Sequence, residues 1–214
     1  MANDWFRKIT WTKEDEKDFF SRLNKARENK KPQYLRIQAI TLYETRNHKY
    51  FNVAINLLNK ILNEYSDNIF EKIMSFKILG DIYCKMKKYD TALKNYNNAI
   101  EFEEKDQHIK TEAYINYSLM VIQLNKIELF DKVELLLLNE IKTGRMFFPI
   151  QKYKINAILS IIYKHKNELE KANDYKAMAE EAANAEFSDF RWHKELGLVE
   201  KRNKTLDKLM KSVK

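Results

Sequence analysis

The sequence predicts an all-α protein, and three observations lead to that prediction. The chain of 214 residues contains only three Gly and two Pro. A sheet protein of this length needs many tight turns, yet neither Asn-Gly nor Asp-Gly occurs. Apolar residues instead recur at spacings of three and four, as on one face of a helix. With 44% hydrophobic and 33% charged residues, the chain can bury a core and is neither disordered nor membrane-like.

The first predicted element is a helix over residues 12–28. Thr12 fits an N-cap, and acidic residues suited to the positive end of a helix dipole follow it. The apolar stripe of this helix consists of Phe19, Phe20, Leu23 and Ala26. Because the residue before a proline disfavours helix, we expect Pro32 to mark the exit from this element.

Four helical hairpins are predicted next, over residues 34–65, 69–104, 108–143 and 149–184. Pro149 suits the first turn of a helix and should open the fourth hairpin, with Gly144 near the end of the helix before it. The last element is a C-terminal capping helix over residues 188–211, starting at Ser188 or Asp189. A glycine, Gly197, falls inside this helix, where it costs about 1 kcal/mol relative to Ala.

Two of the hairpins repeat one another. Leu79, Gly80, Tyr83, Ala92 and Ala99 have counterparts at the same offsets in Leu159, Ser160, Tyr163, Ala172 and Ala179. Small residues at the second and fourth of these positions allow two helices to approach closely. The repetition predicts one continuous array and therefore a single domain over residues 1–214.

The best copy also matches a known pattern, at Phe76, Leu79, Gly80, Tyr83, Tyr89, Ala92, Tyr96 and Ala99. This spacing resembles the tetratricopeptide repeat, a helical hairpin with the pattern W-x2-L-G-x2-Y, then A-x3-F, then A. Glu104 replaces the terminal proline of the pattern. The resemblance implies a right-handed α-solenoid of about four such hairpins, with N- and C-terminal capping helices.

In proteins of this family the first helices of successive hairpins line a concave groove that binds a partner protein or peptide. The resemblance therefore implies a set of groove residues here: Met74, Lys77, Asp81, Cys84, Lys85, Glu112, Ile115, Leu119, Ile122, Gln123, Lys154, Ala157, Ile161, Lys164 and His165. Their mixture of Lys and apolar side chains suits a peptide with acidic and apolar groups. Some relatives clamp a terminal carboxylate, and Lys77 matches the clamp lysine. Asp81 stands where the clamp has Asn and would repel that carboxylate.

The formal net charge of +8 raises a different function, nucleic-acid binding. Eight basic residues occur between positions 189 and 214, against four acidic ones: Arg191, Lys194, Lys201, Arg202, Lys204, Lys208, Lys211 and Lys214. Such a helix could contact phosphates. The interspersed acids and an apolar stripe favour a capping helix with a solvated face, so nucleic-acid binding is the alternative function.

Catalytic and cofactor motifs are missing from the sequence. Three isolated glycines cannot form a phosphate-binding loop, and His48, His108, His165 and His193 do not have the spacing of zinc ligands. Cys84 with His165 is an imaginable nucleophile pair, although a packed thiol is the simpler interpretation. The acidic residues Glu14, Asp15, Glu16 and Asp18 fit a helix first turn better than an acid–base pair. We therefore expect no enzyme activity, no cofactor and no metal.

The single Cys84 excludes a disulfide within the chain and fits a reducing compartment. The N-terminus lacks an apolar leader, and no apolar run approaches the length of a membrane span. These features predict a cytoplasmic protein with no membrane partner. Small Lys- and Asn-rich proteins of this repeat type also resemble bacterial adaptors and toxin-neutralising (immunity) proteins. The leading hypothesis is thus a non-enzymatic protein–protein interaction module, while its partner and its oligomeric state stay open.

Overall fold

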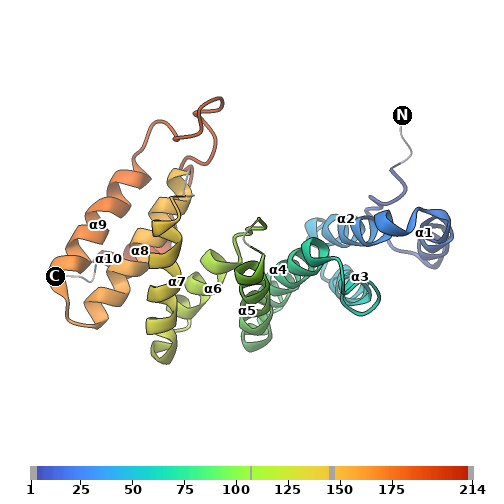
Figure 1. Cartoon of the computed structure of the whole chain (residues 1–214), viewed down its shortest axis with the longest axis horizontal. Helices are drawn as coiled ribbons and strands as arrows, with labels where there is room; N and C mark the ends of the chain where they lie inside the picture. Colours follow the sequence, from blue (N-terminus) through green and yellow to red (C-terminus); the bar gives the residue numbers. More distant parts are fainter. Residues whose placement is uncertain (1–3, 107, 145–147, 212–214) are drawn as a thin grey trace. The chain divides into compact units, whose positions relative to one another are not determined.

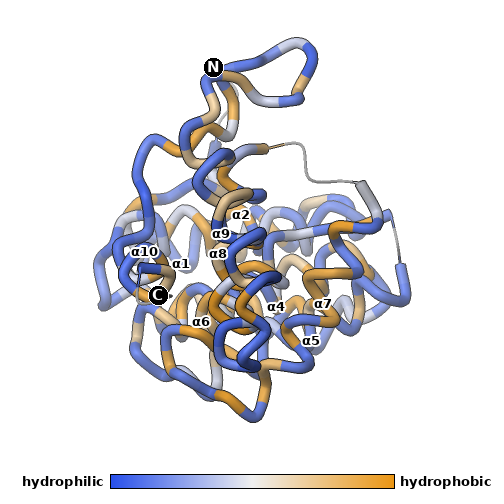
Figure 2. The backbone as a smooth tube through the Cα atoms, turned by 90° about the vertical axis from the view of Figure 1, so that its left-hand side faces the viewer, coloured by the Kyte–Doolittle hydropathy of each residue, from blue (hydrophilic) through white to orange (hydrophobic). Residues whose placement is uncertain are grey.

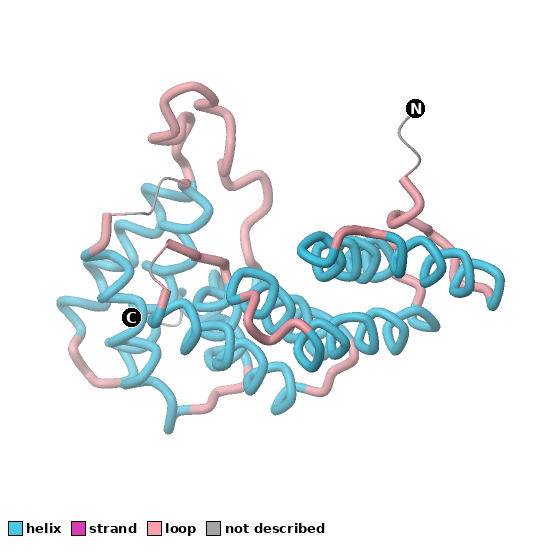
Figure 3. The backbone as a smooth tube through the Cα atoms, turned by 45° about the vertical axis from the view of Figure 1, so that its right-hand side comes forward, coloured by secondary structure: helices cyan, strands magenta, loops and turns pink. Residues whose placement is uncertain are grey.

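The computed structural model describes residues 4–106, 108–144 and 148–211, which form helices and loops without a strand (Figures 1 and 3). The predicted all-α class is confirmed. The α-helices of these residues are α1 (Lys13–Lys25), α2 (Lys31–Glu44), α3 (Phe51–Glu64), α4 (Ile69–Lys85), α5 (Tyr89–Lys105), α6 (Ala113–Gln123), α7 (Phe130–Lys142), α8 (Pro149–His165), α9 (Leu169–Ala183) and α10 (Lys204–Lys211). Their bounds follow the predicted N-terminal helix and hairpins, with the largest difference at the start of α6.

The chain divides into two compact units, Met1–Ala113 and Tyr114–Lys214, where the sequence predicted a single domain. Helices α2 and α3, and α4 and α5, pack as pairs in the first unit, and α8 and α9 do so in the second. Apolar and hydrophilic residues alternate along the helices, as expected of elements that bury one face (Figure 2). A continuous right-handed solenoid and its number of repeats stay predictions.

Helix α1 begins as the sequence predicts. The Thr12 hydroxyl accepts a 3.1 Å hydrogen bond from the backbone N–H of Asp15, whose carboxylate accepts a 3.0 Å bond from the N–H of Thr12. This reciprocal pair is a capping box, and it gives Asp15 a structural role. The helix ends at Lys25, earlier than expected. Pro32 lies in the first turn of α2, so it opens that helix instead of marking the exit from α1.

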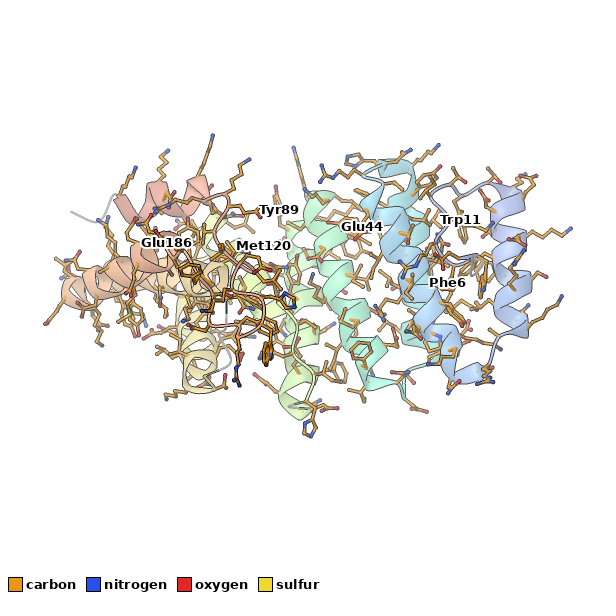
Figure 4. The ribbon with its side chains drawn as sticks, turned by 90° about the horizontal axis from the view of Figure 1, so that it is seen from above. Phe6, Trp11, Glu44, Tyr89, Met120 and Glu186 are labelled. Carbon is orange, nitrogen blue, oxygen red and sulfur yellow. The ribbon has the colours of Figure 1, made fainter. Side chains whose placement is uncertain are left out.

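Aromatic side chains from the segment before α1 close the start of the first unit. The ring of Trp11 lies 5.4 Å from that of the buried Phe19 in α1, and the ring of Phe6 lies 4.7 Å from that of Tyr34 in α2. Figure 4 labels Phe6 and Trp11 at these helices. The segment is therefore part of the first unit's core cluster, which continues through α2, α3 and α4.

The two best repeat copies use the predicted small residues for close helix approach. A Cβ atom on Gly80 would lie 2.5 Å from the ring of Tyr96, so only glycine fits beside this ring. In the second unit Ser160 takes the place of Gly80, and its hydroxyl donates a 2.8 Å hydrogen bond to the carbonyl of Ala172. Both Ser160 and Ala172 are fully buried. These contacts support the offsets by which the two hairpins were aligned.

The turns inside the hairpins share one backbone feature that the sequence did not reveal. A non-glycine residue adopts positive φ two positions before the next helical segment in each case: Arg46 (57°), Lys87 (60°), Asn125 (52°) and Asn167 (61°). After the last three, the next backbone N–H bonds back to a carbonyl five residues earlier, as in a Schellman motif. The same turn is thus found three times along the chain.

The C-terminal prediction is wrong in its extent. Residues 184–203 contain no α-helix, and only Lys204–Lys211 form one (Figure 3). Ser188 closes a loop and does not cap a helix. Its N–H donates a hydrogen bond to the carbonyl of Lys194, and its hydroxyl donates one to the carbonyl of His193. Gly197 has a φ of 71°, and a Cβ there would lie 2.4 Å from Phe148. A positive φ and a close contact therefore explain this glycine.

Candidate functional site

The groove residues predicted on the second hairpin lie on α4 and are mostly engaged within the protein. Lys77 forms a 2.7 Å ion pair with Asp81, whose carboxylate also accepts a 2.7 Å hydrogen bond from the hydroxyl of Tyr96. The positive charge of Lys77 is thus balanced one turn away. Met74 is half-buried and Lys85 is exposed. This arrangement does not make a carboxylate clamp.

Cys84 lacks the environment of a nucleophile. Its thiol is half-buried, and burial together with the nearby Asp81 raises its pKa. A raised pKa lowers the fraction of reactive thiolate. His165, the imagined partner of Cys84, belongs to the other unit, where its ring packs edge-on against Phe130. The structure therefore supports the interpretation of Cys84 as a packed thiol.

Some groove residues predicted on the later hairpins point into the protein. Ile115 of α6 and Ala157 of α8 are fully buried, so they offer no surface to a partner. Leu119 and Lys154 are half-buried, and Glu112 is exposed just before α6. The prediction that all of these side chains face one open groove is wrong for Ile115 and Ala157. For Ala157 the reason is that α7, α9 and α10 all pack against α8.

Five predicted groove residues do converge, and they do so on a cavity of about 650 Å³ in the second unit. These five are Ile122 and Gln123 of α6 and Ile161, Lys164 and His165 of α8. Asn125, which follows α6, and Phe130, the first residue of α7, also line the cavity. The remaining lining residues come from α10 and are Lys204, Thr205, Lys208 and Leu209. Sequence reasoning did not place these four residues at the groove.

The cavity, which we call the α10 cavity, combines an apolar floor with a basic rim. Ile122 and Phe130 are buried, and Ile161 and Leu209 are half-buried beside them. Three lysines line the same space, Lys164, Lys204 and Lys208, together with His165. None of the described lining residues is acidic. The chemistry of this cavity favours a ligand that carries both negative charge and apolar side chains.

Helix α10 is held in place by contacts outside the cavity. Leu206 and Met210, one turn apart, are buried with 0% and 1% of their surface exposed as α10 packs against α8. The hydroxyl of Tyr153 in α8 donates a 2.9 Å hydrogen bond to the carboxylate of Asp207. At the start of the helix, Asn203 accepts bonds from the N–H groups of the first turn.

Arg202 ties the base of α10 to α9. Two of its nitrogens each donate a 2.7 Å hydrogen bond to Glu180, and it also bonds to Asp207. Hydrogen bonds from Arg202 lower the pKa of Glu180. Burial opposes ionisation of Asp207, yet the bonds from Arg202 and Tyr153 bring the pKa of this carboxyl below its usual value. Both carboxylates are therefore ionised at neutral pH and form ion pairs with Arg202.

The basic C-terminal residues do not form one helical face. Arg202 is engaged in the ion pairs above, and the guanidinium of Arg191 lies over the ring of Trp192 in the loop before α10. Lys194 and Lys201 are exposed outside any α-helix, and Lys214 lies outside the described residues. Only Lys204, Lys208 and Lys211 share α10. Of the eight basic residues on which the alternative function depends, three thus lie on one helix.

The fold and the cavity define an all-helical protein with a basic and apolar cavity in its second unit. Within the described residues, no three His, Cys, Asp or Glu side chains gather in a way that could hold a metal ion. None of the described helices is long and apolar enough to cross a membrane. Comparisons of the chain with family models, curated proteins and solved structures give no match.

Proposed function

We propose that this protein is a non-enzymatic interaction module that binds a segment of a partner protein in the α10 cavity. The observation that carries the proposal is the lining: an apolar floor, three lysines and no acidic side chain among the described residues. The partner segment accordingly has carboxylates placed beside large apolar side chains.

The two parts of the lining have different roles in this proposal. Contact with the half-buried Ile161 and Leu209 removes apolar surface of the partner from water, which contributes to the affinity. The lysines steer an acidic segment toward the cavity and fix its orientation. An acidic but wholly polar segment would gain only the second contribution, so both features are required.

The test uses defined peptides, so that it can be carried out before the partner is identified. A labelled peptide of about 12 residues built from Leu and Glu is compared with one in which Gln replaces every Glu. We expect fluorescence anisotropy to show binding of the Glu peptide to the full chain, and binding at least about tenfold weaker for the Gln peptide. Equal binding of the two peptides, or no binding of either, would contradict the proposal.

Charge-reversal variants locate the binding. Lys204→Glu with Lys208→Glu should weaken binding of the Leu–Glu peptide by about tenfold or more, since both lysines line the cavity. The matched control, Lys17→Glu with Lys142→Glu, changes the net charge equally at two exposed lysines that do not line it. If both double variants weaken binding to the same extent, the peptide is attracted by net charge and not by the cavity.

The second candidate function is nucleic-acid binding. It is favoured by the spacing of Lys204, Lys208 and Lys211, which places three ammonium groups on one side of α10. Filter binding of a single-stranded oligonucleotide at about 50 and 200 mM salt tests it, because affinity that depends on phosphate contacts falls steeply with salt. No binding at the lower salt would exclude this candidate.

Within the leading proposal, the protein acts either as an adaptor or as a neutraliser of a toxin. Both roles need a protein partner, and the basic rim suits an acidic surface in either case. A toxin gene directly beside the gene for this chain would support the second role. A neighbourhood without one would favour the adaptor.

A further inference from the structure

The α10 cavity is completed by a helix that has little stability of its own. Four of the lining residues belong to α10, which is eight residues long. Isolated helices shorter than about 12–15 residues are marginal in water. We therefore expect α10 to keep its helical form only while it is packed against α8.

A short tether joins α10 to the rest of the second unit. The carbonyl of Gly197 accepts a 2.8 Å hydrogen bond from the N–H of Ile150, which anchors the preceding loop at the start of α8. Between this anchor and α10 lie only residues 198–203, and none of them is helical. Six extended residues span at most about 20 Å. Helix α10 can thus leave α8 without disturbing the anchored loop, and it stays close to its docking site when it does.

The contacts that hold α10 down are separate from the lining of the cavity. Tyr153 bonds to Asp207, Arg202 bonds to Glu180, and Leu206 with Met210 supplies the buried apolar surface. None of these residues lines the cavity. Docking of α10 and binding in the cavity can therefore be altered independently by mutation.

We propose that α10 is a closing strap: its docking on α8 completes the partner cavity, and the partner segment in turn holds α10 closed. This inference rests on the proposed function, and it adds the regulation of the same site. Because a ligand that contacts only the closed state favours that state, strap closure and partner binding strengthen each other by the same factor. Tyr153 and Arg202 are the positioning residues of the strap.

The first experiment needs no ligand. Hydrogen exchange of the full chain, followed by mass spectrometry, should show residues 204–211 exchanging at least about tenfold faster than residues 153–165 of α8 at neutral pH. Local opening predicts this difference, since α10 can open while α8 stays folded. Equal protection of the two segments would overturn the proposal, because α10 would then open only with the whole unit.

A variant then tests the role of Arg202 as a positioning residue of the strap. Arg202→Gln should speed exchange of residues 204–211 several-fold and leave α7 and α8 unchanged, because the hydrogen bonds of Arg202 join the base of the strap to α9. Lys201→Gln is the matched control at the neighbouring exposed residue, and it should change neither segment. A uniform increase across the second unit in Arg202→Gln would overturn the assignment of this residue to the strap.

The last experiment couples the two processes. Saturating the protein with the Leu–Glu peptide should slow exchange of residues 204–211, and Arg202→Gln should lower peptide affinity several-fold although Arg202 does not line the cavity. If the strap opens locally but no peptide binds, the proposed partner chemistry fails and the strap remains. If the peptide binds but leaves α10 exchange unchanged, and binds Arg202→Gln equally well, the strap proposal fails alone.

Discussion

The hydroxyl group of Tyr153 in α8 donates a 2.9 Å hydrogen bond to the carboxylate of Asp207 in α10, a residue 54 positions later in the chain. The same hydroxyl oxygen accepts a 3.1 Å bond from the backbone N–H of Asn203. Asp207 is bonded further to Arg202, which reaches Glu180 of α9. A single buried tyrosine thus connects the C-terminal helix to a charged network that spans three elements.

Acid should release α10. The pKa values of Asp207 and Glu180 lie below their ordinary values of 3.8 and 4.5, so the ionised forms stabilise the docked state. This contribution is complete above those ordinary values and is lost as pH falls through the lower folded-state values. The charged and titratable groups facing the two carboxylates are Tyr153, Lys176, Arg202 and Lys211.

We therefore predict that exchange of residues 204–211, corrected for its intrinsic pH dependence, accelerates below about pH 4. Asp207→Asn should make part of this dependence disappear, whereas Asp174→Asn, at an exposed position of α9, should preserve it. An α10 that is equally protected at pH 3 and pH 7 would show that the carboxylate network does not hold the helix.

Gly80 and Gly144 should respond differently to side-chain size. A Cβ on Gly80 would lie 2.5 Å from the ring of Tyr96, which is buried and bonded to Asp81 and so cannot move aside easily. We predict that Gly80→Ala lowers the free energy of unfolding by about 1 to 3 kcal/mol and that Gly80→Leu lowers it further.

At Gly144 the cost comes from the backbone instead. Its φ is 67°, and no described atom would lie within 4 Å of an added Cβ, so Gly144→Ala and Gly144→Leu should both cost about 1 kcal/mol. Urea denaturation of the four variants measures these values. A strong dependence on side-chain size at Gly144, or none at Gly80, would contradict the two physical causes.

Local patterns predicted the helices but not the contacts between distant segments. The capping signal at Thr12, the small residues at Gly80 and Ala92, and the proline at the start of α8 each act within one turn or one hairpin, so they could be found in the sequence. The docking of α10 depends on Tyr153 meeting Asp207, and a single sequence contains no signal for that pairing. Four of the eleven lining residues of the cavity, those on α10, were missed for this reason.

The predicted last helix is too long, and at Gly197 the structure shows a local reason. An isolated glycine can be tolerated within a helical pattern, whereas the contact with Phe148 requires both positive φ and the absence of a side chain. The positive φ angles in the hairpin turns were not predicted, for the opposite reason. Lys87 and Arg46 adopt a conformation that usually indicates glycine, so residue type gave no sign of it.

Glycine at a hairpin turn where φ is positive should stabilise the protein. Lys87 has a φ of 60°, a conformation that costs a side-chain-bearing residue about 1 kcal/mol. We predict that Lys87→Gly raises the free energy of unfolding by up to about 1 kcal/mol. Lys88→Gly is the control, since Lys88 has a negative φ and glycine there only increases the freedom of the unfolded chain. Thermal unfolding should move up for the first variant and down for the second; movement in the same direction would refute the strain at Lys87.

Breaking the ion pair between Arg36 and Glu71 should be costly in a way that a double variant repairs. The guanidinium of Arg36 in α2 donates bonds of 2.6 and 3.3 Å to Glu71 in α4, and only 6% of the Glu71 side chain is exposed.

Arg36→Met leaves that carboxylate buried without its partner, so we predict a loss of about 3 kcal/mol in the free energy of unfolding. Arg36→Met with Glu71→Leu removes the stranded charge and should recover most of that loss. Urea denaturation at constant m-value measures both. A double variant no more stable than Arg36→Met would mean that the cost arises from lost packing of the arginine stem, and not from the unpaired carboxylate.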